Sequence, residues 1–224
     1  MTTVTQRLNE VLSTLPASGV ELIAVSKFHP VEAIQEAYDA GHRSFGESRV
    51  QELQQKFELL PRDIKWHFIG HLQTNKVKYI VPYVAMIHSV DSTRILDEIE
   101  RQAARIDRVI DCLLEVHVAQ EESKFGFSMC ECAQFLTAEV IENYPHIRFR
   151  GIMGMATNTD DDGQVADEFA QLKQLFDSLR AGVMSDCDYF DTLSMGMSHD
   201  YRLAIEQGST MVRIGTTIFG ERVY

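Results

Sequence analysis

The feature that most constrains the fold is a regular alternation of short apolar runs with helical patterns along the whole chain. Several runs are rich in Val, Ile, Phe or Tyr, and all are short, as is typical of parallel strands buried on both faces. The pattern therefore predicts eight strands. These are Glu21–Ser26, Ser44–Gly46, Trp66–Gly70, Ala85–Val90, Cys112–Val118, Phe149–Met155, Tyr189–Met195 and Met211–Gly215.

Helical patterns fill the segments between these runs. Pro30 can occupy the first turn of a helix that Gly41 ends, and Ser128 with Glu131 has the spacing of a capping box. An additional amphipathic helix is predicted over Val4–Leu15, before the first strand. A long helix is indicated by an apolar stripe at steps of three and four, formed by Val165, Phe169, Leu172, Phe176 and Leu179.

Eight strands that alternate with helices indicate a parallel sheet with helical crossovers. Eight such units close into a (β/α)8 barrel, and a length of 224 residues lies within the size range of that fold. No Pro/Gly/Ser-rich linker or shift of composition divides the chain. We therefore expect an α/β fold, a single TIM-type (β/α)8 barrel domain over residues 1–224 with an extra N-terminal helix; an open doubly wound sheet is the alternative.

Charge and hydropathy exclude several classes of partner. The net charge is −12 and the basic residues are scattered, whereas a nucleic-acid surface needs clustered positive charge. No run of about eighteen apolar residues occurs, and the N-terminus lacks the pattern of a secretory signal, so no membrane contact is expected. The four cysteines follow no disulfide spacing. These features predict a cytoplasmic protein with reduced thiols, and a barrel of this size can be stable as a monomer.

Two sequence patterns could suggest a metal site, and neither is complete. Cys130 and Cys132 form a C-x-C, but no second Cys/His pair completes a zinc site. His67 and His71 are four residues apart, but Gly70 ends the predicted strand between them, so they do not share one helical face. We therefore expect no metal, and leave open whether His67, His71 and Lys76 line a pocket wall.

Lys27 is an unusual residue for its position, because it follows a buried apolar strand and precedes Phe28 and His29. An isolated lysine there is costly unless something uses it or pairs with it. Desolvation lowers the pKa of an ammonium group and frees the amine for attack on an aldehyde. Lys27 is thus a candidate nucleophile, with an ordinary loop lysine as the alternative.

The last two predicted strand ends have the character of a phosphate site, which in these barrels commonly lies after strands seven and eight. Glycine lets backbone N–H groups approach phosphate oxygens, and Ser or Thr hydroxyls add donors. Arg213 lies within the last strand, where a ligand anion, an acceptor nitrogen or a carboxylate inside the barrel could satisfy it, and we favour the ligand. The candidate residues of the two loops are Ser194, Met195, Gly196, Gly215 and Thr216.

Motifs spread over most of the chain resemble one known family, the pyridoxal phosphate homeostasis proteins, which are similar in fold to the N-terminal barrel of alanine racemase. The match runs in order from Leu22 to Arg222. It rests on Val25-Ser26-Lys27, Phe45-Gly46-Glu47, Val50-Gln51-Glu52, Trp66 to Gln73 with Asn75-Lys76, His88 to Ser92, Lys124-Phe125-Gly126, Gly151-Ile152-Met153, Leu193 to Ser198, and Gly208 to Gly220.

The resemblance implies that Lys27 holds pyridoxal 5′-phosphate (PLP) as a Schiff base, in a cytoplasmic role in vitamin B6 and amino-acid homeostasis. It also implies that the loops after the last strands, including Ser194 and Gly215, hold the cofactor phosphate. An arginine that approaches the pyridine nitrogen falls on Arg213, and because arginine keeps its proton it would leave that nitrogen unprotonated. The family often has Asn-Tyr where this chain has Ser48-Arg49, so Ser48 is a candidate beside the ring whose role stays open.

Three functions fit these residues. The leading one is a protein that carries or buffers PLP without turnover and can pass it to PLP-dependent apoenzymes. The second is a PLP-dependent racemase; alanine racemase uses a tyrosine from a second domain, for which we expect no counterpart in a chain that ends at Tyr224. The third, a Schiff-base aldolase acting on a sugar phosphate, explains Lys27 and the phosphate loops but not the motif order.

Overall fold

A computed structural model describes residues 2–119 and 125–221 of the chain. Lys124 and Arg222, which belong to the motifs and the range behind the family resemblance, lie outside the described residues. All eight predicted strands are present, and one short strand, β6, is added. The strands are β1 (Glu21–Val25), β2 (Ser44–Glu47), β3 (Lys65–Phe68), β4 (Met86–Val90), β5 (Ile110–His117), β6 (Phe127–Ser128), β7 (Ile147–Met155), β8 (Thr192–Ser194) and β9 (Met211–Ile214).

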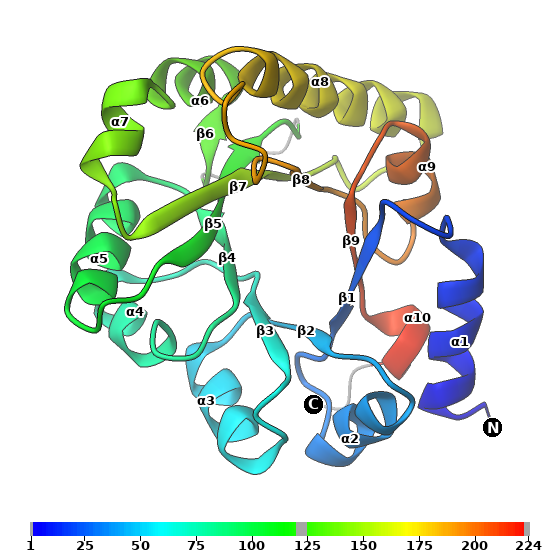
Figure 1. Ribbon diagram of the computed structural model, residues 1–224. Coiled ribbons are helices and arrows are strands. Elements are labelled where there is room, and N and C mark those ends of the chain that lie inside the picture. The colour runs from blue at the N-terminus through cyan, green and yellow to red at the C-terminus, as the bar shows by residue number, and fades with distance from the viewer. Residues whose placement is uncertain (1, 120–124, 222–224) are drawn as a thin grey trace.

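Helices surround the strands on the outside, as Figure 1 shows in a view close to the axis of the sheet. The predicted N-terminal helix packs against the last helix of the chain, and the two lie side by side in Figure 1. The helices are α1 (Val4–Thr14), α2 (Val31–Asp39), α3 (Val50–Leu59), α4 (Thr74–Ile80), α5 (Thr93–Ala104), α6 (Met129–Phe135), α7 (Ala138–Asn143), α8 (Asp162–Ala181), α9 (Tyr201–Glu206) and α10 (Thr216–Phe219).

The sheet closes on itself. Its strand order is β4-β3-β2-β1-β9-β8-β7-β5-β6, every pairing is parallel, and a further pairing of β4 with β5 closes the ring. Among the described residues, eight strands therefore form a closed parallel barrel, with β6 attached to β5 outside the ring. The expected TIM-type barrel with an extra N-terminal helix is confirmed, and the open doubly wound sheet is wrong.

Two apolar layers hold the barrel. Side chains alternate between the two faces of a strand, so Leu22 and Ala24 join the layer under the helices while Ile23 faces the interior. Trp66 and Phe45 are fully buried in the outer layer. Burial of such a side chain contributes roughly 1.5–3 kcal/mol. The interior holds a small separate cluster of Ile23, Met86, Leu113, Met153 and Met211.

Local signals in the sequence account for the ends of several helices. Pro30 caps α2, and Ser128 with Glu131 makes both hydrogen bonds of a capping box at α6. The structure differs at several strand ends; for example, β3 stops at Phe68, two residues before Gly70, and β8 begins at Thr192 rather than at Tyr189. Apolar residues that pack in loops are the reason, because a hydrophobic run does not distinguish a strand from the buried turn beside it.

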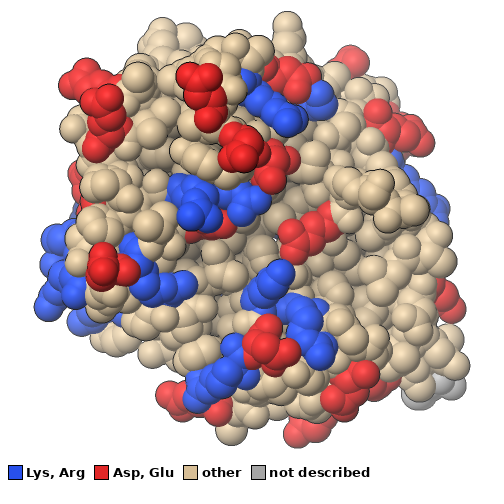
Figure 2. Space-filling model, in the orientation of Figure 1, with Lys and Arg blue, Asp and Glu red and all other residues tan. Residues whose placement is uncertain are grey.

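Acidic and basic side chains are interspersed over the face of the molecule in Figure 2, with no block of one sign. Several form exposed or half-exposed ion pairs, among them Arg43 with Asp63 and Arg150 with Asp111. Such pairs add at most about 1 kcal/mol each. Of the helices in residues 2–119 and 125–221, none combines the length and the apolar character needed to cross a bilayer.

Candidate functional site

The residues that the sequence singles out lie at one end of the barrel. Lys27 comes two residues after β1, Ser48 directly follows β2, Ser194 ends β8, and Arg213 is the penultimate residue of β9. In the sheet, β2, β1, β9 and β8 are consecutive and parallel, so their carboxyl ends share one rim. We call this end of the barrel the carboxyl rim. The remaining predicted residues lie in the rim loops after β8 and β9: Met195, Gly196, Gly215 and Thr216.

Lys27 is half-buried, and the backbone on both sides of it is held by buried polar groups. Lys56 on α3 donates a hydrogen bond to the carbonyl oxygen of Ser26 (2.8 Å). The backbone N–H of Phe28 donates to a carboxylate oxygen of Glu52 (2.6 Å). Phe28 has a φ of +66°, which a bulky residue rarely adopts, so these contacts hold a strained turn. The direction in which Lys27 leaves the strand is therefore fixed by its neighbours.

A buried ion-pair network lies behind this turn. Lys56 Nζ lies 2.7 Å from Glu47 Oε1 and 2.6 Å from Glu52 Oε1, and the Ser26 hydroxyl donates to Glu47 Oε1 at 2.6 Å. Glu47 is fully buried and Lys56 is 4 % exposed. Burial raises the pKa of Glu47 to about 7, and the positive charge of Lys56 opposes that rise. We call Glu47, Glu52, Lys56 and the Ser26 hydroxyl the lysine-turn network.

Arg213 points into the barrel interior, because its neighbours Val212 and Ile214 belong to the outer layer. Its NH1 donates to the carbonyl and hydroxyl oxygens of Ser194 (2.8 and 2.6 Å), and its NH2 donates to the carbonyl of Gly154 (3.0 Å). Burial lowers the pKa of Arg213 to about 10. These oxygens are the hydrogen-bond partners of the guanidinium among the described residues, while the carboxylates of Asp200 and Glu115 act on it through their charge.

Two histidines extend this arrangement across the barrel. His88 Nδ1 lies 3.3 Å from the Ser194 hydroxyl, and His88 Nε2 lies 2.9 Å from His67 Nδ1. Burial, as the main cause, lowers the pKa of His67 to about 4. It also lowers the pKa of His88 well below its ordinary value. Both imidazoles are therefore neutral at pH 7. His67 thus lies in the barrel interior, away from the exposed His71.

The two predicted phosphate loops are adjacent, but their residues differ in burial and in hydrogen bonding. The Met195 side chain is fully buried in the outer layer, and the Ser194 hydroxyl is engaged by Arg213 and His88. Gly196 has a φ of +96°, and a Cβ there would lie 2.6 Å from the Cβ of Ala204, so only glycine fits. Gly215 donates its N–H to the hydroxyl of Ser198 at 3.2 Å, and Thr216 is exposed at the start of α10.

A cavity of about 200 Å³ lies at the same rim over β5 and β7. Glu115 and His117 from the end of β5, Met155 from β7 and Met197 from the loop after β8 contribute to its wall. Burial, together with the charge of Asp91, raises the pKa of Glu115 to about 7, whereas Arg213 acts in the opposite direction. This wall therefore carries a carboxyl group that changes its charge near neutral pH.

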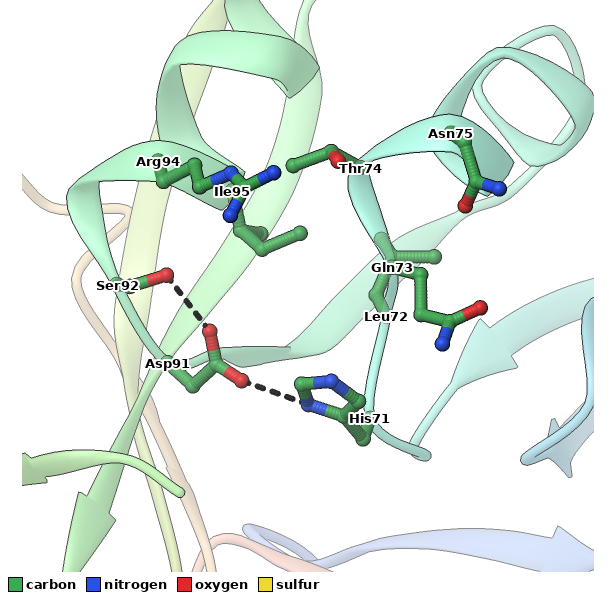
Figure 3. A pocket seen from close by; sticks show the side chains of 9 residues that line it. All are labelled: His71, Leu72, Gln73, Thr74, Asn75, Asp91, Ser92, Arg94 and Ile95. Carbon is green, nitrogen blue, oxygen red and sulfur yellow. Dashed lines mark hydrogen bonds and ion pairs between the residues drawn. The ribbon is translucent and has the colours of Figure 1, made fainter. Parts of the chain in front are cut away.

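A second hollow, of about 510 Å³, lies over the ends of β3 and β4 and is shown in Figure 3. His71 Nδ1 lies 2.8 Å from Asp91 Oδ2, and the Ser92 hydroxyl donates to the other oxygen of Asp91 at 2.9 Å. His71 also borders a smaller cavity of about 200 Å³ that Ser48 and Lys76 line. The sequence left open whether His67, His71 and Lys76 line a pocket wall; in the structure His71 and Lys76 line these hollows, and His67 lies in the barrel interior. Within the described ranges, no cluster of three metal-ligating side chains occurs.

Sequence reasoning assigned no role to several residues of this rim. Glu47 and Glu52 stand in motifs of the family resemblance, yet their common partner Lys56 lies outside them. The i,i+4 spacing of Glu52 and Lys56 on a predicted helix was the available signal, but such pairs are usually solvated. Glu115 sits within an apolar run and gave no signal of its own.

The closed parallel barrel with a lysine at the end of its first strand defines the class of protein. The family model described as "Alanine racemase, N-terminal domain" matches residues 2–223. A curated relative from Pasteurella multocida named "Pyridoxal phosphate homeostasis protein" is 40 % identical over 212 residues, which are 93 % of this chain and 89 % of the relative. The chain therefore belongs to the pyridoxal phosphate homeostasis proteins, within the alanine racemase N-terminal domain family.

Solved structures agree with this assignment. PipY of Synechococcus elongatus with PLP bound has a TM-score of 0.86 and is 35 % identical, covering 97 % of this chain and 100 % of PipY. PipY without PLP gives a TM-score of 0.90 at the same identity and coverage. Alanine racemase from E. faecalis shares the fold, with a TM-score of 0.74 and 17 % identity over 97 % of this chain and 57 % of the racemase chain.

Proposed function

We propose that this protein binds PLP as a Schiff base on Lys27 and serves intracellular vitamin B6 and amino-acid homeostasis without turning over a substrate. One observation carries the proposal: a lysine, a buried arginine and two glycine-containing loops meet at one rim of the barrel on consecutive strands. The names of the curated relatives and the PLP-bound PipY structure support the same ligand.

The residues of the rim suit this cofactor. Ile23 on β1 is paired with Arg213 on β9, and both face the barrel interior. Alternation along β1 puts Val25 on that same side, and Lys27 follows in the turn two residues after the strand. Gly215 lies opposite Val25 without a side chain of its own. A Cβ on Gly215 would lie 3.1 Å from the carbonyl oxygen of Val25. The backbone of Gly215 therefore packs closely against β1, beside the turn that carries the Lys27 amine and on the same face as the Arg213 cation.

Each residue would have a separate task. PLP supplies an aldehyde and an electron-withdrawing ring, and the Lys27 amine holds the aldehyde covalently. The Ser194 and Gly154 oxygens engage three of the five N–H groups of Arg213, so it has further donors for a ring nitrogen and would keep that nitrogen unprotonated. Gly196, Gly215 and Thr216 would hold the phosphate. Ser48 would border the ring, while Ser194 and Met195 would act by fixing Arg213 and the loop backbone.

A carrier is the function these residues support best. The relatives are named as homeostasis proteins rather than as enzymes, and the likeness to alanine racemase is one of fold alone. We further propose that the protein acts as a cytoplasmic monomer and passes PLP to PLP-dependent apoenzymes. Sedimentation of the PLP-loaded protein tests the monomer, and activation of an apoenzyme by stoichiometric loaded protein tests the transfer.

The test of binding is a visible-absorbance titration of the purified protein with PLP. We expect the wild type to develop the band of a protonated Schiff base at one equivalent, and Lys27→Ala to lack it. Lys76→Ala is the matched control, because Lys76 also lines a cavity at the rim but belongs to α4, the helix that follows β3. Loss of the band in the control but not in Lys27→Ala would refute the assignment of Lys27.

Two assays separate the carrier from the other candidate functions. Racemisation of alanine or another amino acid by the PLP-loaded protein, abolished in Lys27→Ala, would replace the carrier by a racemase. Cleavage of a sugar phosphate by protein that holds no PLP would support a Schiff-base aldolase instead. We expect neither activity above the rate given by free PLP.

A further inference from the structure

Four buried polar side chains form a continuous hydrogen-bonded chain through the barrel interior. They are His67 on β3, His88 on β4, Ser194 on β8 and Arg213 on β9, and none is more than 4 % exposed. The successive distances are 2.9, 3.3 and 2.6 Å. Because β5 and β7 separate β4 from β8 in the sheet, the contact of His88 with Ser194 crosses the barrel. We call these four residues the interior chain.

Burying the polar groups of the interior chain costs free energy that an apolar filling of the same space would not. The rest of the interior cluster is apolar, and a buried polar group costs free energy unless its hydrogen bonds are made. One end of the chain is the arginine of the proposed cofactor site. The other end, His67 Nε2, has no hydrogen-bond partner among the described residues. Hydrogen bonding at that atom therefore does not explain why the interior chain is buried.

The donors and acceptors of the four side chains decide in which direction the hydrogen bonds of the interior chain run. Arginine can only donate, so the Ser194 oxygen accepts from Arg213 and its single hydroxyl hydrogen is available for His88 Nδ1. His88 then carries its hydrogen on Nε2 and donates to His67 Nδ1. In the opposite direction, His67 would donate to His88 and His88 would donate to Ser194. The Ser194 hydroxyl hydrogen would then have no acceptor, in addition to the unpaired His67 Nε2. The first arrangement leaves fewer groups unpaired and is the one we adopt.

We propose that His88, supported by His67, is a positioning residue for Arg213, which it controls by fixing the rotation of the Ser194 hydroxyl. With that hydroxyl turned toward His88, its oxygen presents a lone pair to Arg213 NH1 beside the Ser194 carbonyl. The guanidinium then has one allowed orientation, with its remaining N–H groups available to an acceptor nitrogen in an aromatic ring. This inference rests on the proposed function, since the ring is that of the bound cofactor.

The chemical consequence is specific to the cofactor. A fixed donor to the ring nitrogen keeps the ring neutral there, which in turn sets the basicity of the Schiff base on Lys27. A role in stability alone would lower the melting temperature without changing that basicity. The readout that separates the two roles is the midpoint of the pH titration of the visible band.

The variants are His88→Leu, which cannot accept from Ser194, and His88→Asn, whose side-chain oxygen can. We expect His88→Leu to weaken PLP binding about tenfold or more, the effect of one lost hydrogen bond to a charged group. Its titration midpoint should move by roughly half a pH unit, a shift equivalent to about 0.7 kcal/mol. His88→Asn should recover most of both effects.

Leu114→Ala is the matched control, because Leu114 is fully buried on β5 but belongs to the outer layer, whereas the interior chain lies inside the barrel. It should lower the melting temperature and leave the midpoint and the affinity as in the wild type. An unchanged midpoint and affinity in His88→Leu would overturn the inference. So would equal shifts in His88→Leu and Leu114→Ala, which would mean general loosening of the barrel.

A measurement on the protein without PLP keeps the inference testable if His88→Leu does not fold. Nitrogen-15 NMR of the histidine side chains should show His67 and His88 neutral, with the hydrogen on Nε2, between about pH 5.5 and 8. Ser194→Ala should shift the Nδ1 signal of His88. A hydrogen on His88 Nδ1 would overturn the inference. If instead the wild type takes up no PLP while these signals are as described, it is the proposed function that fails.

Discussion

Replacing Lys56 by methionine tests the lysine-turn network. Lys56 Nζ has three oxygen acceptors within 2.8 Å, from Ser26, Glu47 and Glu52, and the side chain is almost fully buried. Removing one partner of a buried ion pair typically costs about 3–5 kcal/mol. Glu47 can take up a proton, since its pKa is already about 7, and this limits the loss. We therefore expect about 3 kcal/mol.

The assay is urea unfolding at pH 7, followed by circular dichroism, together with thermal unfolding. For a domain of this size, a loss of about 3 kcal/mol corresponds to a decrease of roughly 6–12 °C in melting temperature. Lys173→Met is the matched control, because Lys173 also pairs with an acidic residue four positions away, but at the surface. It should cost less than about 1 kcal/mol. Equal effects of the two substitutions would refute the reasoning.

Two further predictions concern the carboxyl rim. Gly196→Ala combines a φ of +96° with a clash at Ala204, so it should destabilise by about 2–4 kcal/mol, whereas Gly41→Ala, with a φ of +99° and open space, should cost about 1 kcal/mol. Melting curves that coincide would contradict this. The pKa of Glu115 is raised in the folded state, so the folded form holds a proton that the unfolded form releases between about pH 4.5 and 7. The contribution of this group to the free energy of unfolding of the wild type is lost as the pH rises through that window. Between pH 5 and pH 8, the free energy of unfolding of Glu115→Gln should therefore rise by up to about 3 kcal/mol relative to the wild type. A difference in urea unfolding that stays constant with pH would refute this prediction.

The barrel could be predicted because its signals are local. Buried parallel strands appear as continuous apolar runs such as Cys112–Val118, and helix ends carry their own marks, as the capping box of Ser128 and Glu131 shows. Even the weakly apolar run at Ser44 is a strand, since Ser44 is buried beside β1 and β3. The fold class follows from the number and order of these runs.

The polar interior could not be predicted, because its partners are distant in sequence. His88 and Ser194 are separated by 106 residues, and nothing near either one indicates the other. The same holds for Lys56 and the carbonyl of Ser26. Sequence reasoning placed Lys27 and Arg213 at one site through the barrel geometry, but it could not say that the Ser194 hydroxyl would contact Arg213.

The most direct test of the account is covalent mapping of the cofactor. The PLP-loaded protein is reduced with borohydride, digested, and its peptides are analysed by mass spectrometry. We expect one pyridoxyl addition, on the peptide that contains Lys27, and none on peptides that contain Lys56 or Lys76. An addition confined to another lysine, or no addition to a protein that shows the visible band, would contradict it.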